Sequence, residues 1–157
     1  MCENKKFNSQ TQYKNIFGVN LSNNEDPDFK MAQILQAESA LLFDLRQTLK
    51  GRKTKTGICL QLPEFKWFVN CLLVNNNKVN ILEHDSRVIK LEKSADQIII
   101  SVKKADNTTR NVTLNQTETH KLINHLKEFE KKMIDKALDC GLETDFNEFD
   151  YVKIIYE

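Results

Sequence analysis

The sequence is poor in the patterns on which catalysis and nucleotide binding usually depend. No serine or cysteine stands in a local nucleophile motif. Paired acidic residues fall in expected turns and near the C-terminus, where solvation accounts for them. The 157 residues include only four glycines, none in a Gly-rich phosphate-binding pattern: Gly18, Gly51, Gly57 and Gly141. We therefore expect no catalytic residues and a chain that is not an enzyme.

Metal-ligand spacings are missing as well. Cys59 falls in an expected strand and Cys71 on the buried side of an expected helix, so both are expected to be reduced core thiols. His120 and His125 are five residues apart on one expected helix, which places them on different faces, and the histidines are expected at the surface. We expect no metal, cofactor or disulfide from the histidines and cysteines: His84, His120, His125, Cys2, Cys59, Cys71 and Cys140.

Long apolar runs are also missing. No hydrophobic stretch approaches the roughly 18 residues of a membrane span. The mean hydropathy of −0.51 and the 29% of charged residues are typical of a soluble protein. Residues 1–12 are polar and expected to be disordered, and the N-terminus lacks a hydrophobic signal region. We therefore expect an intracellular protein that does not bind membranes.

The net charge of +1 hides an uneven distribution. Residues 137–157 carry six acidic side chains against Lys153 alone, and the remainder of the chain has a net charge of +6. A mildly basic body with an acidic tail can bind a polyanion, with the tail competing for the same surface. Ordinary solubility is the alternative explanation.

One structural pattern occurs twice. Residues 41–73 and residues 98–126 each contain an apolar strand ending in a basic residue, a polar turn, a short strand and an amphipathic helix. A unit that recurs about 55 residues later is typical of one packing arrangement used twice. Two matched halves can build a pseudo-symmetric surface.

Hydrophobic periodicity and turn residues define the expected elements. Pro63 suits the first turn of one helix, and Thr117 is expected to cap a longer one that reaches Gly141 and can pack on the other half. Residues 29–37 fit neither period, and the repeat favours an extended segment. Residues 151–156 are expected to form a last strand or a docking peptide. The other strands are expected at 13–21, 41–49, 58–62, 79–82, 88–91, 97–104 and 111–115.

Basic residues recur at equivalent places in the two copies, at a strand end and around the following turn. Cations at the same edge of two matched sheets can follow a phosphate backbone. The alternative is that a turn must be polar and tolerates lysine readily. We predict phosphate contacts for Arg46, Lys50, Arg52, Lys53, Lys55, Lys103, Lys104 and Arg110.

Four motifs of the first copy are FDLR, KGRK, GICL and PEFKW, which begin at residues 43, 50, 57 and 63. They resemble the positive cofactor 4 family of transcriptional coactivators, in which I-D-I-R leads through K-P-G-R-K-G into I-S-L and a helix beginning N-P-E-x-W. The second copy, with IISVK, RNVTL and NQTE, resembles the same domain by order and spacing. The resemblance covers roughly residues 13–138.

The resemblance implies a non-enzymatic, nuclear single-stranded-DNA-binding protein that acts as a transcription coactivator or as a replication or transcription accessory factor. It implies an α+β fold of two tandem β-β-β-β-α repeats, at residues 13–75 and 78–140, followed by an acidic tail at 141–157. In that family two chains pair through their helices, and their curved antiparallel sheets present channels for single-stranded DNA. Here the two halves are expected to form an intramolecular pseudo-dimer. Transcription-machinery proteins are expected partners, and two such chains could also form a homodimer.

The chain departs from that family where bases stack. The family places an aromatic residue three positions after the strand-end arginine, where this chain has Leu49 and Asp106. A second stacking position falls near Ala37 and at Ser94. Stacking contributes roughly 1–3 kcal/mol per base, so these losses are expected to weaken or redirect binding. Trp67 matches a packing tryptophan of the family and is expected in the core.

Three alternatives remain open. The purine-rich-element-binding family also has tandem repeats with a strand followed by K-G-R, and it too implies single-stranded DNA or RNA. A protein-interaction module could have kept the fold and lost most nucleic-acid binding, with the tail masking the surface or recruiting a partner. The third alternative is a purely structural homodimer.

Overall fold

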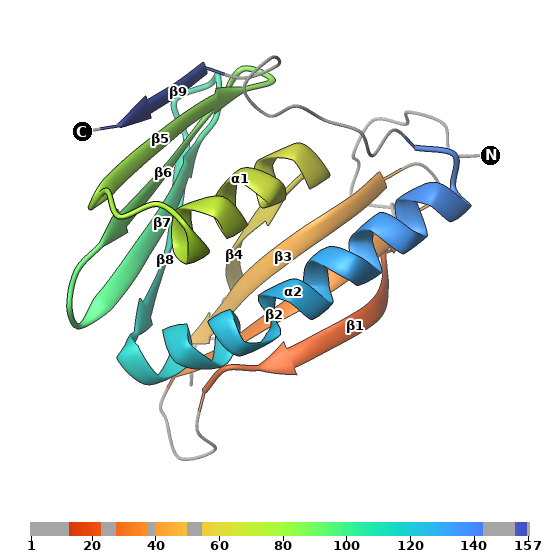
Figure 1. Cartoon of the computed structure of the whole chain (residues 1–157), viewed down its shortest axis with the longest axis horizontal. Coiled ribbons are helices and arrows are strands. Elements are labelled where there is room, and N and C mark those ends of the chain that lie inside the picture. The colour runs from red at the N-terminus through yellow and green to blue at the C-terminus, as the bar shows by residue number, and fades with distance from the viewer. Residues whose placement is uncertain (1–12, 23–27, 38–39, 50–54, 143–152, 157) are drawn as a thin grey trace.

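The computed structural model describes residues 13–22, 28–37, 40–49, 55–142 and 153–156. It is an α+β fold in which four antiparallel strands followed by a helix occur twice, as the sequence predicts (Figure 1). The first unit contains β1 (Lys14–Asn20), β2 (Asp28–Ala37), β3 (Ala40–Leu49), β4 (Lys55–Leu60) and α1 (Leu62–Leu73). The second contains β5 (Val79–His84), β6 (Arg87–Lys93), β7 (Gln97–Lys103), β8 (Thr109–Asn115) and α2 (Gln116–Asp139), and β9 (Lys153–Tyr156) follows.

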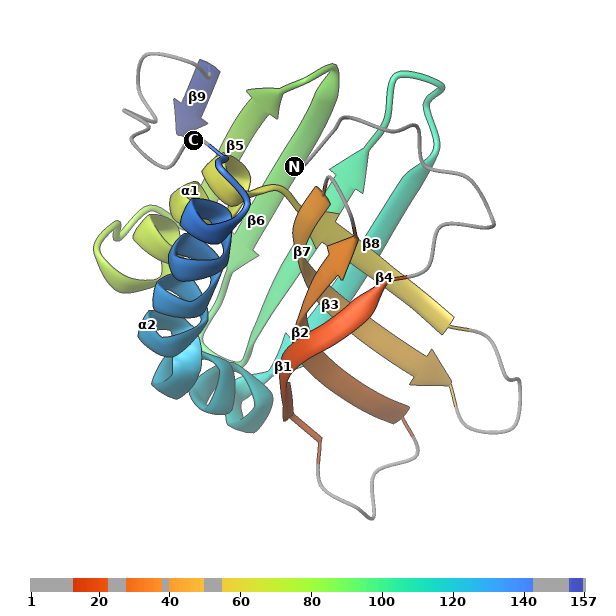
Figure 2. The ribbon, with the colours of Figure 1, turned by 90° about the vertical axis from the view of Figure 1, so that its right-hand side faces the viewer.

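Each sheet has an inner face that packs on the helices and an outer face. The strand orders are β1-β2-β3-β4 and β8-β7-β6-β5-β9. In β7, Ile98, Ile100 and Val102 are buried while their neighbours are more exposed, which is the alternation of a strand with one face in a core. Figures 1 and 2 show α1 and α2 side by side along the inner faces of the sheets. The extended segment expected at residues 29–37 is confirmed as part of β2.

A single hydrophobic core joins the two units. Phe129 of α2 reaches the first sheet, where its ring centroid lies 4.8 Å from that of Phe17 and 5.3 Å from that of Phe43. Phe43 also stacks on Phe65 of α1, with 4.4 Å between centroids. Trp67 is 1% exposed, so its predicted core position is confirmed. The expected packing of the longer helix on the other half is confirmed by Phe129.

Each helix begins with a buried glutamate at its third position. Glu64 accepts a hydrogen bond from the backbone N–H of Gln61, and Glu118 accepts one from that of Asn115, both at 2.8 Å. These bonds are half of a capping box, in which a side chain at the third position returns to the capping residue. The Asn115 side chain accepts from the backbone N–H of Glu118 at 2.8 Å, so Asn115 is the cap and the prediction of Thr117 is wrong.

The first helix starts one residue before Pro63. Leu62 was expected to continue the alternation of β4, but it is the first residue of α1 and is buried there. Pro63 costs no hydrogen bond in this first turn, because backbone N–H groups there have no partner within the helix. Neither this helix nor any other in the described residues is long and apolar enough to cross a bilayer.

The two glutamates connect the units reciprocally. Glu64 of the first unit lies 2.9 Å from Nδ1 of His84 and 3.4 Å from Nη1 of Arg87, which flank the β5–β6 turn of the second unit. Glu118 of the second unit lies 3.0 Å from Nζ of Lys30, on β2 of the first unit. Each helix N-terminus therefore holds a cation from the first hairpin of the other unit. Such mutual exchange is the pattern of an interface with two-fold symmetry, here formed within one chain.

The chain's last described strand lies at an edge of the second sheet. β9 pairs antiparallel with β5, from Asn80 opposite Tyr156 to Glu83 opposite Lys153. The expectation of a final strand is therefore confirmed for residues 153–156. Because β8 forms the other edge of the same sheet, β9 lies across the sheet from β8.

Removing the carboxylate of Glu64 should destabilise the whole fold. In Glu64→Ala the largely buried Arg87 and His84 lose their anionic partner, and breaking a buried pair from one side costs about 3 kcal/mol. Glu128→Ala, an exposed position on α2, is the control and should change the free energy of unfolding by less than about 0.5 kcal/mol. Urea denaturation followed by circular dichroism measures both. Equal stability of the two variants would contradict a linking role for Glu64.

Candidate functional site

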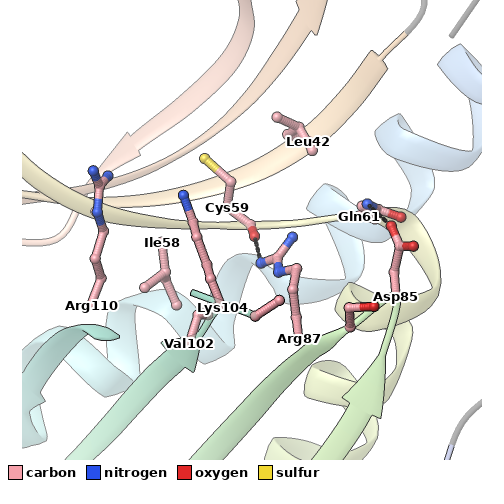
Figure 3. A pocket seen from close by; sticks show the side chains of 12 residues that line it. Leu42, Ile58, Cys59, Gln61, Asp85, Arg87, Val102, Lys104 and Arg110 are labelled. Atoms are coloured by element: carbon pink, nitrogen blue, oxygen red, sulfur yellow. Dashed lines mark hydrogen bonds between the residues drawn. The ribbon is translucent and has the colours of Figure 1, made fainter. Parts of the chain in front are cut away.

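A cavity of about 470 Å³ opens where the two units meet (Figure 3). Its walls come from β3, from β4 and the residue before α1, from the β5–β6 turn and from the β7–β8 hairpin. Leu42, Ile58 and Val102 give it apolar walls. The volume lies within the range of about 300–1,000 Å³ that is typical of ligand pockets.

Three cations of the second unit line this cavity. Arg87 comes from β6, Lys104 follows β7, and Arg110 belongs to β8. In Figure 3, Arg110 and Lys104 lie toward one end, and Asp85 lies with Gln61 at the other. Asp85 is the acidic residue among the described lining residues. The cavity therefore has a basic end, a middle that contains apolar side chains and Arg87, and an end with polar, acidic groups.

The strand pattern explains how Arg110 reaches the cavity. Along β8, Val112 and Leu114 are buried on the inner face, and Arg110 has the same parity at the exposed end of the strand. Its partner on the adjacent strand, β7, is Val102. The cavity is thus the place where the shared core opens to solvent, and Arg110 stands at that opening.

Arg87 is fixed by contacts with the first unit. Its Nη2 donates to the backbone carbonyl of Cys59, and its Nη1 pairs with Glu64. Its buried Nε has no hydrogen-bond partner among the described residues. Arg87 therefore ties the β5–β6 hairpin to β4, and its charge is held at the cavity wall.

The β5–β6 turn presents Asp85 in a constrained conformation. Asp85 and Ser86 have φ values of 53° and 62°, the left-handed pair that a tight two-residue hairpin requires. Aspartate tolerates this region better than most residues. Its Oδ2 accepts a hydrogen bond from Nε2 of Gln61 at 3.3 Å, so the acidic group is held next to α1 of the first unit.

A chain of polar side chains crosses the outer face of the first sheet beside the cavity. Asn15 donates to Gln33 at 2.8 Å, and Gln33 donates to the buried carboxylate of Asp44 at 2.7 Å. Asp44 also accepts from the Cys59 thiol at 3.3 Å and pairs with Nε of Arg46 at 3.3 Å. Asp44 therefore positions Arg46 on this face.

Cys59 is a structural thiol and not a nucleophile. Burial, together with the negative charge of Asp44 and the hydrogen bond to it, raises the pKa of Cys59 to about 12. A thiol with such a pKa stays protonated and unreactive at neutral pH. Gly57, two residues before Cys59, leaves little room for a side chain, because a Cβ there would lie 3.0 Å from the carbonyl oxygen of Leu45. The expected core position is confirmed for the fully buried Cys71, whereas Cys59 is half-buried and lies against Asp44 on the outer face.

The structure brings together part of the predicted basic set. Lys104 and Arg110 share the cavity, and Arg46 lies opposite Gly57, a residue of its wall. Lys103 is exposed, but it alternates to the other face of β7 from Val102. Lys50, Arg52 and Lys53 lie outside the described residues, and for Lys55 only the place in β4 is described.

Sequence reasoning missed the charged residues that connect the units. Glu64 is fully buried, so solvation does not explain it, and the spacing Gln61 to Glu64 was the available capping signal. His84 is not a simple surface histidine, because it bonds Glu64. No local pattern marks Arg87 or Asp85, because their partners are distant in the chain.

The comparisons with known proteins give structural neighbours alone. No family model and no curated protein sequence matches this chain. WHY1 from Arabidopsis thaliana is similar at 9% identity and a TM-score of 0.46, covering 83% of this chain and 93% of the other. MRP1/MRP2 from Trypanosoma brucei is similar at 14% identity and a TM-score of 0.45, covering 82% of this chain and 98% of the other.

The contact between His84 and Glu64 predicts a pH-dependent stability. The hydrogen bond to Glu64 raises the pKa of His84 above its usual 6.5, against an opposing effect of burial. A raised pKa in the folded state means that this stabilisation is fully present below about pH 6.5 and is lost as the pH rises through the folded pKa.

His84→Gln is the variant that measures this effect. The free energy of unfolding of the wild type should exceed that of His84→Gln most at pH 5.5, and the difference should shrink by pH 8.5. Urea titrations at several pH values give the comparison, and His120→Gln, at an exposed site on α2, is the control. A difference that is constant with pH would contradict the assignment.

Proposed function

We propose that this chain is a non-enzymatic protein that binds single-stranded nucleic acid at the junction of its two units. The observation that carries the proposal is the convergence of Arg87, Lys104 and Arg110 on one cavity that also has apolar walls. Cations alone would suit any polyanion. Apolar side chains beside them suit a strand whose bases are not paired, because the bases of a duplex are already stacked inside it.

Lys104 and Arg110 would hold phosphates, and Arg46 would extend the basic path along the first sheet. Arg87 already pairs with Glu64, so it would attract phosphates through its positive charge more than through a free hydrogen-bond donor. The described lining of the cavity includes no aromatic side chain, as the departure from the stacking positions suggests. Affinity would then depend mainly on charge and fall steeply with salt.

A role in transcription or replication, in the nucleus and with transcription-machinery proteins as partners, is part of the same proposal. It is supported by the resemblance of the FDLR, KGRK, GICL and PEFKW segments to the positive cofactor 4 family. The reciprocal contacts of Glu64 and Glu118 also fit two repeats that take the place of two chains.

Charge reversal at the basic end tests the proposal. The double variant Lys104→Glu with Arg110→Glu should bind a labelled single-stranded oligonucleotide at least about tenfold more weakly in low salt, because two phosphate contacts become repulsive. The dependence of log K on log salt should become shallower by about 1.4, at about 0.7 per lost contact.

The matched control is Lys127→Glu with Lys131→Glu, which makes the same change in charge on the exposed side of α2. Fluorescence anisotropy at two salt concentrations measures the wild type and both variants. The proposal fails if the wild type shows no binding at low salt, or if the two double variants lose affinity equally.

A second candidate function, a protein-interaction module, is favoured by β9. Its four residues pair with β5, and short edge strands of this kind can give way to a strand from another protein. The acidic tail that contains β9 would then recruit a partner protein without changing the affinity for nucleic acid.

Deleting residues 142–157, which removes β9 together with the acidic tail, distinguishes recruitment of a partner from masking of the basic surface. Because β9 lies at the opposite edge of the sheet from Arg110, we expect the affinity for single-stranded DNA to change by less than about twofold. Anisotropy with the truncated chain measures it. Clearly tighter binding after truncation would mean that the tail masks the basic surface.

A further inference from the structure

We propose that the acidic end of the cavity is a base-recognition site that selects guanine from the bound strand. This inference rests on the proposed function, because it assumes that the basic end holds the strand. The residue concerned is Asp85, at the other end of the cavity, which has no role in phosphate binding.

An acidic residue is out of place in a surface that only binds phosphates. Asp85 lines the same cavity as Lys104 and Arg110, and it would repel a polyanion that followed the whole cavity. The side chain nevertheless has a defined position, set by the tight turn and by the hydrogen bond from Gln61. A held carboxylate beside a phosphate-binding end is an arrangement that contacts a nucleotide at both its phosphate and its base.

The dimensions and walls of the cavity suit an unpaired base. In Figure 3, Ile58 and Val102 lie beside Lys104, Arg87 lies between them and Asp85, and Leu42 adds a third apolar side chain to the lining. A cavity of about 470 Å³ has room for one nucleotide. The flat face of a base can pack on these aliphatic side chains and on the guanidinium group of Arg87, and its polar edge then faces Asp85.

The chemistry of the carboxylate decides which base fits. An ionised carboxylate is an acceptor with two oxygens and about four lone-pair sites, so the bond from Gln61 leaves capacity for further donors. Guanine presents two adjacent donors, the ring N1–H and the 2-amino group. Adenine and cytosine present one donor beside an acceptor, and the single ring N–H of thymine is flanked by two carbonyl oxygens. Guanine alone can therefore donate to both carboxylate oxygens at once.

Single-base substitution in an oligothymidine tests the inference. One oligonucleotide carries a single central guanine, a second carries hypoxanthine there, which lacks the 2-amino group, and a third carries thymine throughout. All three have the same number of phosphates. We expect the wild-type chain to bind the guanine oligonucleotide about tenfold more tightly than the other two, the lower part of the range for one bidentate base contact.

The variant Asp85→Asn should abolish this preference. Asparagine is nearly isosteric, tolerates a positive φ and keeps an acceptor for Gln61, so the turn is preserved. Removing a negative charge should strengthen binding of all three oligonucleotides, so the readout is the ratio of affinities. Asp96→Asn, in the exposed β6–β7 turn and outside the cavity lining, removes the same charge and should keep the preference.

The outcomes distinguish this inference from the proposed function. Equal binding of the three oligonucleotides by the wild type, or a guanine preference that survives in Asp85→Asn, overturns the base site and leaves strand binding intact. Absence of binding to all three at low salt overturns the proposed function itself. A preference that is lost in Asp85→Asn and kept in Asp96→Asn supports the assignment.

Discussion

The way in which the two units pack together depends on two buried carboxylates, each of which forms an ion pair with a basic side chain of the opposite unit. Glu64 and Glu118 are almost completely removed from water, and a buried charge is tolerated only when it is paired and hydrogen-bonded. Arg87 with His84 on one side, and Lys30 on the other, satisfy this requirement. The hydrophobic core is non-directional, whereas these contacts fix which hairpin meets which helix.

The cavity follows from the same constraint. The contact with Glu64 brings the β5–β6 turn against the start of α1, and this places Asp85 beside Gln61. The β7–β8 hairpin of the same sheet brings Lys104 and Arg110 toward the other end of the cavity. The first unit supplies most of one wall and the second unit supplies all three described cations of the lining. The proposed site therefore exists only when the two units are docked.

Much of the fold could be predicted from the sequence, because it is encoded locally. Alternating residues such as Ile98 and Ile100 mark strands, and Pro63 marks the beginning of a helix. The strand at residues 28–37 required the repeat, since its own pattern was ambiguous. The site was predicted only in part. Lys104 and Arg110 could be predicted because they flank a polar turn with basic residues. Asp85, Arg87 and the Asp44 network owe their roles to neighbours from other strands, and no periodicity records such contacts.

The edges of the two sheets have a consequence for how the protein behaves at high concentration. Free strand edges are templates for uncontrolled stacking of chains. Here the edge beyond β5 is the four-residue strand β9, the β4 and β8 edges lie against each other, and β1 carries a register shift between Asn15 and Phe17 that interrupts a regular ladder. The described edges of the two sheets are therefore short, irregular or in contact with another strand, and these are features that disfavour edge-to-edge pairing of chains.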